Sequence, residues 1–331
     1  MLPFISIVIP TKNNEDLIGK CMKSIRELDY PQDRIEVIVS DGKSTDKTQE
    51  IALSYGAIVI IDQHDTSVCS ARNAAFEIVK GEFVAMCDAD CVVHKDWLKN
   101  SLKYFDNPKV GGIGGANLIP KDETPFGKAV GLLFAYAPLV VKSANTRVLK
   151  KVIESRSHGS NAIYRMDVLK RVVPIDESVI GGEDVIMNDK IEDLGYKLLY
   201  VPDVIVYHYR RPNIKRWWNS MYRYGMGRVI LPRYRKGEVA PLHIITGYSL
   251  PIFIFIVVAL LAYNPAWLLV LVELIAILVV ITFVLALLST RSIKVGLNMP
   301  LVLAIFVLAW SCGYLHEKYC VEDRSVKCPE S

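Results

Sequence analysis

Two carboxylates one residue apart, Asp88 and Asp90, directly follow the apolar run at 83–87. A short strand that ends in such a pair can direct both acids toward one point beyond the edge of a sheet. Carboxylate oxygens are ligands that Mn²⁺ and Mg²⁺ accept, and a cation held there can bind a diphosphate. A lone pair of acids after a strand is more often a solvated turn, so the metal hypothesis needs support from other residues.

Other chemically active residues follow apolar runs in the same way. Thr11 follows the run at 4–9, and Asp41 follows the run at 35–39. Later in the chain, Glu183 and Asp184 follow two glycines and begin a helical pattern. Acids at the start of a helix interact favourably with its dipole, so a capping role is the alternative for this second pair.

The elements that position these residues alternate along the chain. Short apolar runs at 4–9, 35–39, 57–61 and 83–87 are separated by helix-period segments at 15–28, 46–55 and 68–79. This alternation predicts an α/β fold with a mostly parallel sheet flanked by helices. Ligands bind at the carboxyl ends of such strands, so Thr11, Asp41 and the 88–90 segment should converge on one crevice. We also expect a strand at 110–116 and helices at 126–141, 166–172 and 183–194. The helix at 126–141 is either an interfacial helix or an ordinary packed one.

The C-terminal third has a different composition. The chain has 331 residues with a net charge of +4, too small a charge to indicate a nucleic-acid partner. Three long apolar stretches, at about 243–263, 266–289 and 296–315, each approach the ~20 residues that cross a bilayer as a helix. We therefore expect a domain at 1–230, a linker at 231–242, three transmembrane helices at 243–316 and a polar tail at 317–331.

Basic residues indicate the orientation in a cell membrane. Arg228 and Arg233 precede the first stretch and Arg291 and Lys294 lie between the second and third, whereas the loop at 263–265 has no charge. By the positive-inside rule, this multi-pass arrangement places the N-terminal domain in the cytoplasm and the C-terminus outside. The N-terminus leads straight into a strand pattern and has no signal-peptide pattern.

Cysteines and one intramembrane acid leave alternatives open. Cys21, Cys69, Cys87 and Cys91 have no metal-type spacing and suit core or surface thiols. Cys320 and Cys328 either form a disulfide or remain free in a disordered tail. Glu273, inside the second apolar stretch, should face another helix or water, or else a lipid head group.

Several segments, in order and spacing, resemble the inverting family 2 glycosyltransferases of GT-A fold. The segments are SIVIPTKN (6–13), VSDGKSTD (39–46), ARNAA (71–75), GEF (81–83) before DAD (88–90), GED (182–184) and LGYK (194–197) before Pro202. The resemblance covers residues 4–230. It implies that the protein uses a nucleotide-sugar donor and Mn²⁺ or Mg²⁺. It also implies a membrane-anchored enzyme similar to the polyprenyl- and dolichol-phosphate-linked sugar transferases.

The resemblance also implies roles for matching positions. The nucleotide site of the family matches Pro10, Thr11, Asp41, Arg72 and Asp88. Its metal ligands match Asp90, Asp88 and His208. Its catalytic base matches Asp184, with Glu183 as the acidic neighbour. Taken alone, a histidine among aromatic residues such as His208 is more often a packed strand residue. Lys12 stands where the family often has an aromatic residue.

A basic and aromatic segment precedes the first apolar stretch. It contains Arg216, Trp217, Trp218 and Arg223, which we expect to bind the acceptor. Polymer-forming relatives carry a Gln-x-x-Arg-Trp signature, and this chain has Asn213 in the glutamine position. An interfacial helix anchored by tryptophan and arginine is the alternative, and both interpretations are compatible.

These observations predict an inverting, metal-dependent transfer of a sugar to a polyprenyl-linked acceptor at the cytoplasmic membrane face. The acceptor is either a lipid phosphate or a lipid-linked saccharide, and membrane lipid is a further partner. Alternatives are a transferase of a polysaccharide or glycolipid pathway, a nucleotidyltransferase and a non-catalytic relative. Asp41, Asp90 and Asp184 are all present, which argues against the last.

Overall fold

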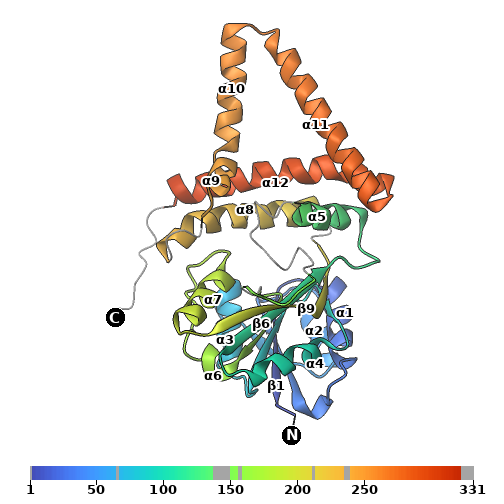
Figure 1. Ribbon diagram of the computed structural model, residues 1–331, viewed down its shortest axis with the longest axis vertical. Coiled ribbons are helices and arrows are strands. Elements are labelled where there is room, and N and C mark those ends of the chain that lie inside the picture. Colours follow the sequence, from blue (N-terminus) through green and yellow to red (C-terminus); the bar gives the residue numbers. More distant parts are fainter. Residues whose placement is uncertain are drawn as a thin grey trace. The chain divides into compact units, whose positions relative to one another are not determined.

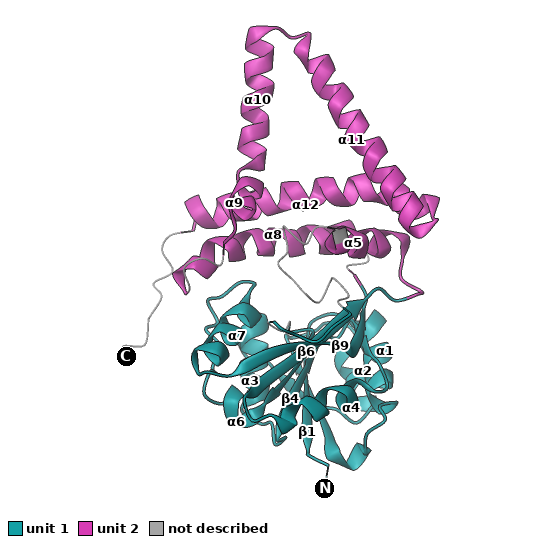
Figure 2. Ribbon diagram, in the orientation of Figure 1, with its two compact units in different colours: residues 1–120, 142–209 teal, residues 121–141, 210–331 magenta. Residues whose placement is uncertain are grey.

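The computed structural model describes residues 2–64, 67–136, 150–155, 159–210, 213–234 and 239–321 (Figure 1). Contacts divide the chain into two compact units (Figure 2). Unit 1 comprises residues 1–120 and 142–209, and unit 2 comprises residues 121–141 and 210–331. The predicted domain boundary at residue 230 stays a prediction; by contacts, 121–141 and 210–230 group with the C-terminal helices.

The first half of unit 1 forms the predicted alternation of strands and helices. β1 (Ile5–Thr11), β2 (Ile35–Asp41), β3 (Ile58–Ile61) and β4 (Phe83–Cys87) pair in parallel. The intervening helices are α1 (Glu15–Arg26), α2 (Thr48–Ser54) and α3 (Val68–Phe76). Each predicted strand and helix of this half is present, with ends shifted by a few residues.

The second half of unit 1 completes a mixed sheet. Its strands are β5 (Cys91–Val93), β6 (Val110–Leu118), β7 (Ile153–Glu154), β8 (Asn161–Arg165) and β9 (Lys197–His208); its helices are α4 (Trp97–Leu102), α6 (Met166–Leu169) and α7 (Glu183–Asp193). Among the described residues the order is β3-β2-β1-β4-β8-β6-β9-β5, with β7 beside β9. β8 is antiparallel to both neighbours, and β6 is parallel to β9. The predicted α/β sheet with flanking helices is confirmed, with antiparallel strands added in its second half.

The apolar core of unit 1 buries its first strand beneath α1. Ile5, Ile7 and Ile9 of β1 are fully buried together with Ile18 and Met22 of α1. Alternate residues of a strand share one face, so these isoleucines pack under the helix. Complete burial of an aliphatic side chain contributes about 1.5–3 kcal/mol. This packing fixes the register that sets the strand ends.

Unit 2 is helical among its described residues. Its helices are α5 (Pro125–Tyr136), α8 (Ile214–Ile230), α9 (Pro241–Gly247), α10 (Ser249–Tyr263), α11 (Trp267–Thr290) and α12 (Ile293–Tyr319). The predicted helix at 126–141 corresponds to α5, and its residues 137–141 lie outside the described ranges. The first predicted span is two helices, α9 and α10, bent by 56°. By length and composition α11 and α12 are candidate spans, and the bent pair is a third candidate.

Within unit 2, α12 runs beside α8 and α5 at the open end of the α10–α11 hairpin (Figure 2). The indole Nε1 of Trp217 on α8 donates to the carbonyl of Val302 on α12 at 3.0 Å. A Cβ added at Gly225 would lie 2.2 Å from the Trp310 carbonyl oxygen, and one at Gly313 would lie 1.9 Å from that of Tyr222. The two helices therefore approach closely, and each close approach requires glycine.

Candidate active site

The ends of β1 and β2 are locked side by side in unit 1. Thr11 and Asp41 are register partners, and the amide of Gly42 donates to the Thr11 carbonyl at 2.8 Å. Asn13 adopts a left-handed backbone with φ 51°, which asparagine tolerates. The backbone N–H of Asn13 donates to Ser44 Oγ at 2.8 Å, and the side-chain Oδ1 of Asn13 accepts from the backbone N–H of Thr45 at 2.9 Å. Pro10, Thr11 and Asp41, which were predicted to bind the nucleotide, thus lie at the adjacent carboxyl ends of β1 and β2.

Asp41 is buried and held by its neighbours. Its Oδ1 accepts from the amide of Ser44 at 2.7 Å and from Gln49 Nε2 at 2.8 Å. Its Oδ2 accepts from Ser44 Oγ at 2.6 Å. An ionised carboxylate has about four acceptor positions. Oδ2 therefore retains capacity for one further donor.

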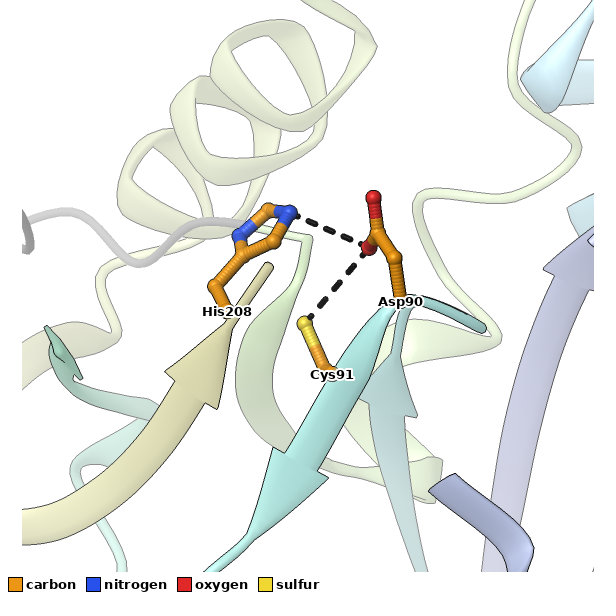
Figure 3. Close-up of side chains that lie close together, drawn as sticks. All are labelled: Asp90, Cys91 and His208. Carbon is orange, nitrogen blue, oxygen red and sulfur yellow. Dashed lines mark hydrogen bonds and ion pairs between the residues drawn. The ribbon is translucent and has the colours of Figure 1, made fainter. Parts of the chain in front are cut away.

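Asp90, Cys91 and His208 form a cluster where β4 ends and β5 begins (Figure 3). Cys91 and His208 are register partners on β5 and β9, which brings the imidazole toward the acid. His208 Nε2 lies 3.1 Å from Asp90 Oδ1, and Cys91 Sγ lies 3.8 Å from the same oxygen. The potential ligand atoms all lie within 4.8 Å of one another. The pairing of Asp90 with His208 follows the sequence prediction, whereas the nearness of Cys91 was missed although it adjoins Asp90.

The guanidinium of Arg72 lies among carboxylates. Arg72 is only 3% exposed; its Nη1 is 2.8 Å from Glu183 Oε1 and its Nη2 is 3.7 Å from Asp88 Oδ1. Burial acts to lower the pKa of Arg72, but the neighbouring carboxylates, Glu183 first, raise it overall. The arginine thus joins α3, the end of β4 and the start of α7 through charge-assisted contacts.

Glu183 and Asp184 begin α7 after a turn that depends on glycine. Gly181 and Gly182 have φ of 80° and 97°, a region that side-chain-bearing residues rarely adopt. Burial raises the pKa of Glu183, against the opposing effect of Arg72. The Oδ2 of Asp184 accepts from the amide of Gly159 at 3.4 Å. The Glu183 carboxylate therefore faces Arg72, which the capping alternative does not require.

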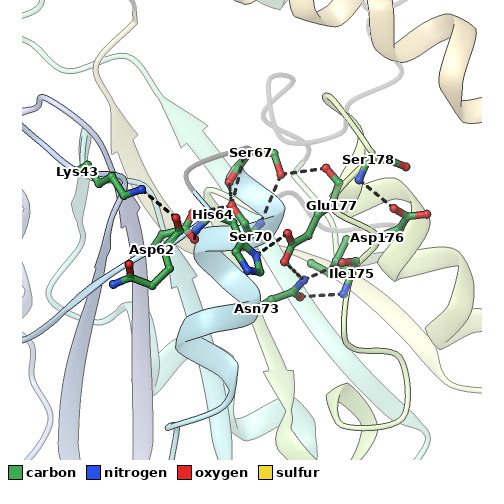
Figure 4. Close-up of polar contacts among 11 residues, drawn as sticks. Lys43, Asp62, His64, Ser67, Ser70, Asn73, Ile175, Asp176, Glu177 and Ser178 are labelled. Carbon is green, nitrogen blue, oxygen red and sulfur yellow. Dashed lines mark hydrogen bonds and ion pairs between the residues drawn. The ribbon is translucent and has the colours of Figure 1, made fainter. Parts of the chain in front are cut away.

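A side-chain amide ties α3 to the loop that leads to α7 (Figure 4). Asn73 Nδ2 donates to the Ile175 carbonyl at 2.7 Å, and Asn73 Oδ1 accepts from the Ile175 amide at 2.8 Å. Nearby, His64 Nδ1 lies 2.9 Å from Glu177 Oε2, and Ser67 Oγ donates to the Glu177 carbonyl. Sequence reasoning gave Asn73 no role; its position directly after Arg72 was the available signal.

The four residues predicted to bind the acceptor belong to α8 in unit 2. Asn213 caps this helix by accepting from the amide of Arg216 at 2.9 Å. Trp217 is fully buried against Phe134 and Phe306, whereas Trp218 is half-buried and Arg223 is exposed. The burial of Trp217 supports a packing role for that residue.

The sequence matches known proteins over the region that carries this site. The family described as "Glycosyl transferase family 2" matches residues 6–173, about half of the chain. "Glycosyltransferase AglE" of Haloferax volcanii is 29% identical over 234 residues, which cover 69% of this chain and 74% of that protein. A Methanococcus voltae protein is 26% identical over 249 residues, which cover 71% and 75%; its name is "Dolichyl N-acetyl-alpha-D-glucosaminyl phosphate 3-beta-D-2,3-diacetamido-2,3-dideoxy-beta-D-glucuronosyltransferase".

A solved structure shares the fold. It is "Mannosyltransferase PcManGT from Pyrobaculum calidifontis in complex with GDP-Man and Mn2+". The TM-score is 0.65 at 22% identity, with 97% of this chain and 89% of that chain covered. This likeness confirms the predicted GT-A fold.

Asn73→Ala tests whether the amide pair positions the site. We expect a loss of turnover of at least about tenfold, because the substitution leaves the Ile175 backbone groups unpaired and frees the loop before α7. Asn100→Ala is the matched control, since Asn100 also bonds a backbone carbonyl, that of Asp203 at 2.9 Å, outside the site. Equal turnover in the two variants, measured with a sugar-transfer assay, would contradict a positioning role for Asn73.

Proposed function

The chain belongs to glycosyl transferase family 2 and is a nucleotide-sugar-dependent glycosyltransferase, and we propose that it transfers its sugar, with inversion, to a polyprenyl-linked acceptor. The observation that carries the proposal is that side chains suited to this chemistry lie in pairs at strand ends of one sheet: Thr11 beside Asp41, and Asp90 beside His208. Arg72 connects this edge with Glu183 and Asp184.

The donor nucleotide is proposed to bind at the ends of β1 and β2. The remaining acceptor position on Asp41 Oδ2 suits a ring N–H of a base, with Pro10 and Thr11 beside it. Arg72 and Asp88 lie in contact at the same edge of the sheet. We propose that Asp88 approaches the ribose and that Arg72 contacts the nucleotide.

The donor atoms of the Asp90 cluster fit a divalent cation. Asp90 supplies a carboxylate oxygen and His208 an imidazole nitrogen, a set that Mn²⁺ accepts. Asp88, the further ligand predicted from the sequence, lies outside this three-residue cluster, and its Oδ1 is 3.7 Å from Arg72 Nη2. When bound, such an ion neutralises charge on the departing nucleotide diphosphate. The structure of the Pyrobaculum mannosyltransferase in complex with GDP-Man and Mn²⁺ supports this assignment.

Asp184 is proposed to act as the general base. A hydroxyl acceptor must lose its proton as it attacks the anomeric carbon, and a carboxylate at the start of α7 can take that proton. Attack from the face opposite the leaving diphosphate inverts the anomeric centre. The buried Glu183 pairs with Arg72, so we propose that it holds the arginine in place.

The acceptor is proposed to be a lipid carried by the membrane. The Methanococcus voltae relative is named for a dolichyl phosphate substrate, and unit 2 contains apolar helices long enough to cross a bilayer. On α8, Arg216 and Arg223 are seven residues apart and so lie on one face of the helix, where both can contact phosphate. We propose that unit 1 faces the cytoplasm. The expectation that the C-terminus lies outside requires α12 to be a third span.

Metal dependence is tested with Asp90→Asn. We expect transfer to fall by about 10² or more, because a ligand of the charge-neutralising ion is lost. Excess EDTA should abolish wild-type transfer, and added Mn²⁺ or Mg²⁺ should restore it. Asp96→Asn is the matched control, since Asp96 also faces a histidine, with its Oδ2 3.6 Å from His94 Nδ1. Full activity in EDTA would remove the metal from the mechanism.

Asp184→Asn should separate donor binding from turnover. The amide cannot accept the proton, so we expect near-normal donor affinity in calorimetry and a large loss of kcat. Asp193→Asn, at the other end of α7, should leave both unchanged. A phosphate acceptor is already ionised at neutral pH and would make the loss smaller. Weakened donor binding at unchanged kcat would reassign Asp184 to the nucleotide site.

Lipid-acceptor use is tested with Arg223→Ala and Arg223→Lys in the full-length chain. Lysine keeps the charge but not the bidentate geometry, so both variants should raise the KM for a polyprenyl-linked acceptor. Slow hydrolysis of the donor should persist in both. Normal acceptor use by Arg223→Lys would indicate that the residue supplies charge alone, and normal use by both variants would contradict a phosphate contact.

A further inference from the structure

Length and composition select α11 and α12 equally as membrane spans, but their surroundings within unit 2 differ. In the most apolar 18-residue window of each helix, none of α11 is buried inside the structure, whereas half of α12 is buried. The buried half includes Val302, Phe306 and Trp310, which belong to one apolar cluster with Trp217 of α8. α12 therefore has a protein partner along much of its length, and α11 is open to lipid.

The partner of α12 is a charged helix. α8 carries Lys215, Arg216, Arg223 and Arg228, and Lys215 and Arg223 are exposed. The contacts run from Trp217 with Val302 to Tyr222 with His316, so α12 remains beside α8 for several turns. Arginine and lysine are strongly unfavourable at the centre of a bilayer. A membrane-crossing α12 would bring those charges into the hydrocarbon or would have to separate from α8.

The outer face of α12 suits the membrane interface. Ile293, Leu297, Leu301 and Leu308 are exposed and spaced four, four and seven residues apart, which places them on one helical face. Its opposite face packs on α8, which supplies basic side chains. The two helices together are amphipathic, with apolar residues on α12 and charge on α8.

The α10–α11 hairpin has the features of the crossing element. α11 has 24 residues, about 36 Å at 1.5 Å per residue, which exceeds the ~30 Å hydrocarbon core. α10 has 15 residues, about 22 Å, so it needs the last turn of α9 or local thinning to cross. Tyr263 and Trp267 flank the uncharged tip and are 83% and 48% exposed, and aromatic residues favour membrane interfaces.

We propose that only the α10–α11 hairpin crosses the membrane, and that α12 lies in the interface beside α8 and α5. Two crossings return the chain to the side on which it began, so the C-terminus shares the side of unit 1. This arrangement replaces the sequence-based expectation of a third span and an outside C-terminus. It also places Lys318 on the same side as Arg228, Arg291 and Lys294, as the positive-inside rule favours.

Depth measurements by electron paramagnetic resonance test the proposal without requiring activity. Spin labels are placed at Leu297 and Leu308 of α12, and at Leu269 and Val280 of α11, in the full-length chain in lipid vesicles. Each pair is 11 residues apart, about 16 Å along a helix axis, and all four side chains are exposed. We expect the α12 labels to report one shallow depth and the α11 labels to differ by most of that distance. Equal depth differences in the two pairs would overturn the proposal.

Labelling with a membrane-impermeant maleimide gives an independent test of sidedness. Only Cys312, Cys320 and Cys328 need replacement, because Cys21, Cys69, Cys87 and Cys91 are buried. Asn264→Cys should react in intact cells, whereas Ile293→Cys and Val321→Cys should react only after permeabilisation. Reaction of Val321→Cys from outside, with Ile293→Cys protected, would restore the third span. Reaction of all three after permeabilisation confirms that each site is reachable.

Discussion

The arrangement of the site depends on the ion pairs that the buried guanidinium of Arg72 makes. It is almost wholly buried, and it contacts Glu183 at the start of α7 and Asp88 after β4. The segments that carry these three residues are far apart in sequence. Removing one partner of a buried ion pair typically lowers the free energy of unfolding by about 3–5 kcal/mol. The amide pair between Asn73 and Ile175 acts one residue later on α3 and holds the loop that leads to α7. Together they make the position of Asp184 a consequence of the packing of α3.

The charge balance around this arginine bears on what the site can bind. Asp88, Glu183 and Asp184 all act on Arg72, so acids outnumber the cation in the part of the site that the structure describes. A nucleotide diphosphate would add further negative charge. Arg72 is already engaged, so a second source of positive charge is needed for binding to be favourable. Asp90 and His208 offer ligands for one, which agrees with the proposed metal dependence.

The sequence predicted the parts of the site that depend on local patterns. The apolar runs at 4–9, 35–39 and 83–87 indicated three strand ends to within two residues, and a parallel sheet brings such ends together. It did not predict the partner of β9, because β6 lies about eighty residues earlier and pairs with it through two register shifts. The amide pair of Asn73 was missed for the same reason: its partner Ile175 is 102 residues away. Contacts of this kind depend on tertiary packing, which no local pattern encodes.

The C-terminal helices show where a hydropathy argument stops. A run of twenty apolar residues indicates a helix that is shielded from water, but it does not indicate whether lipid or protein covers that helix. For α11 the described structure offers almost no protein cover; for α12 it offers α8, with glycines at 225 and 313 that permit close approach. In the proposed topology the basic residues of α8 hold α12 near the membrane surface, because charged side chains are strongly unfavourable in the hydrocarbon core. The proposed number of crossings therefore rests on Arg216, Arg223 and Arg228, which lie outside every apolar stretch.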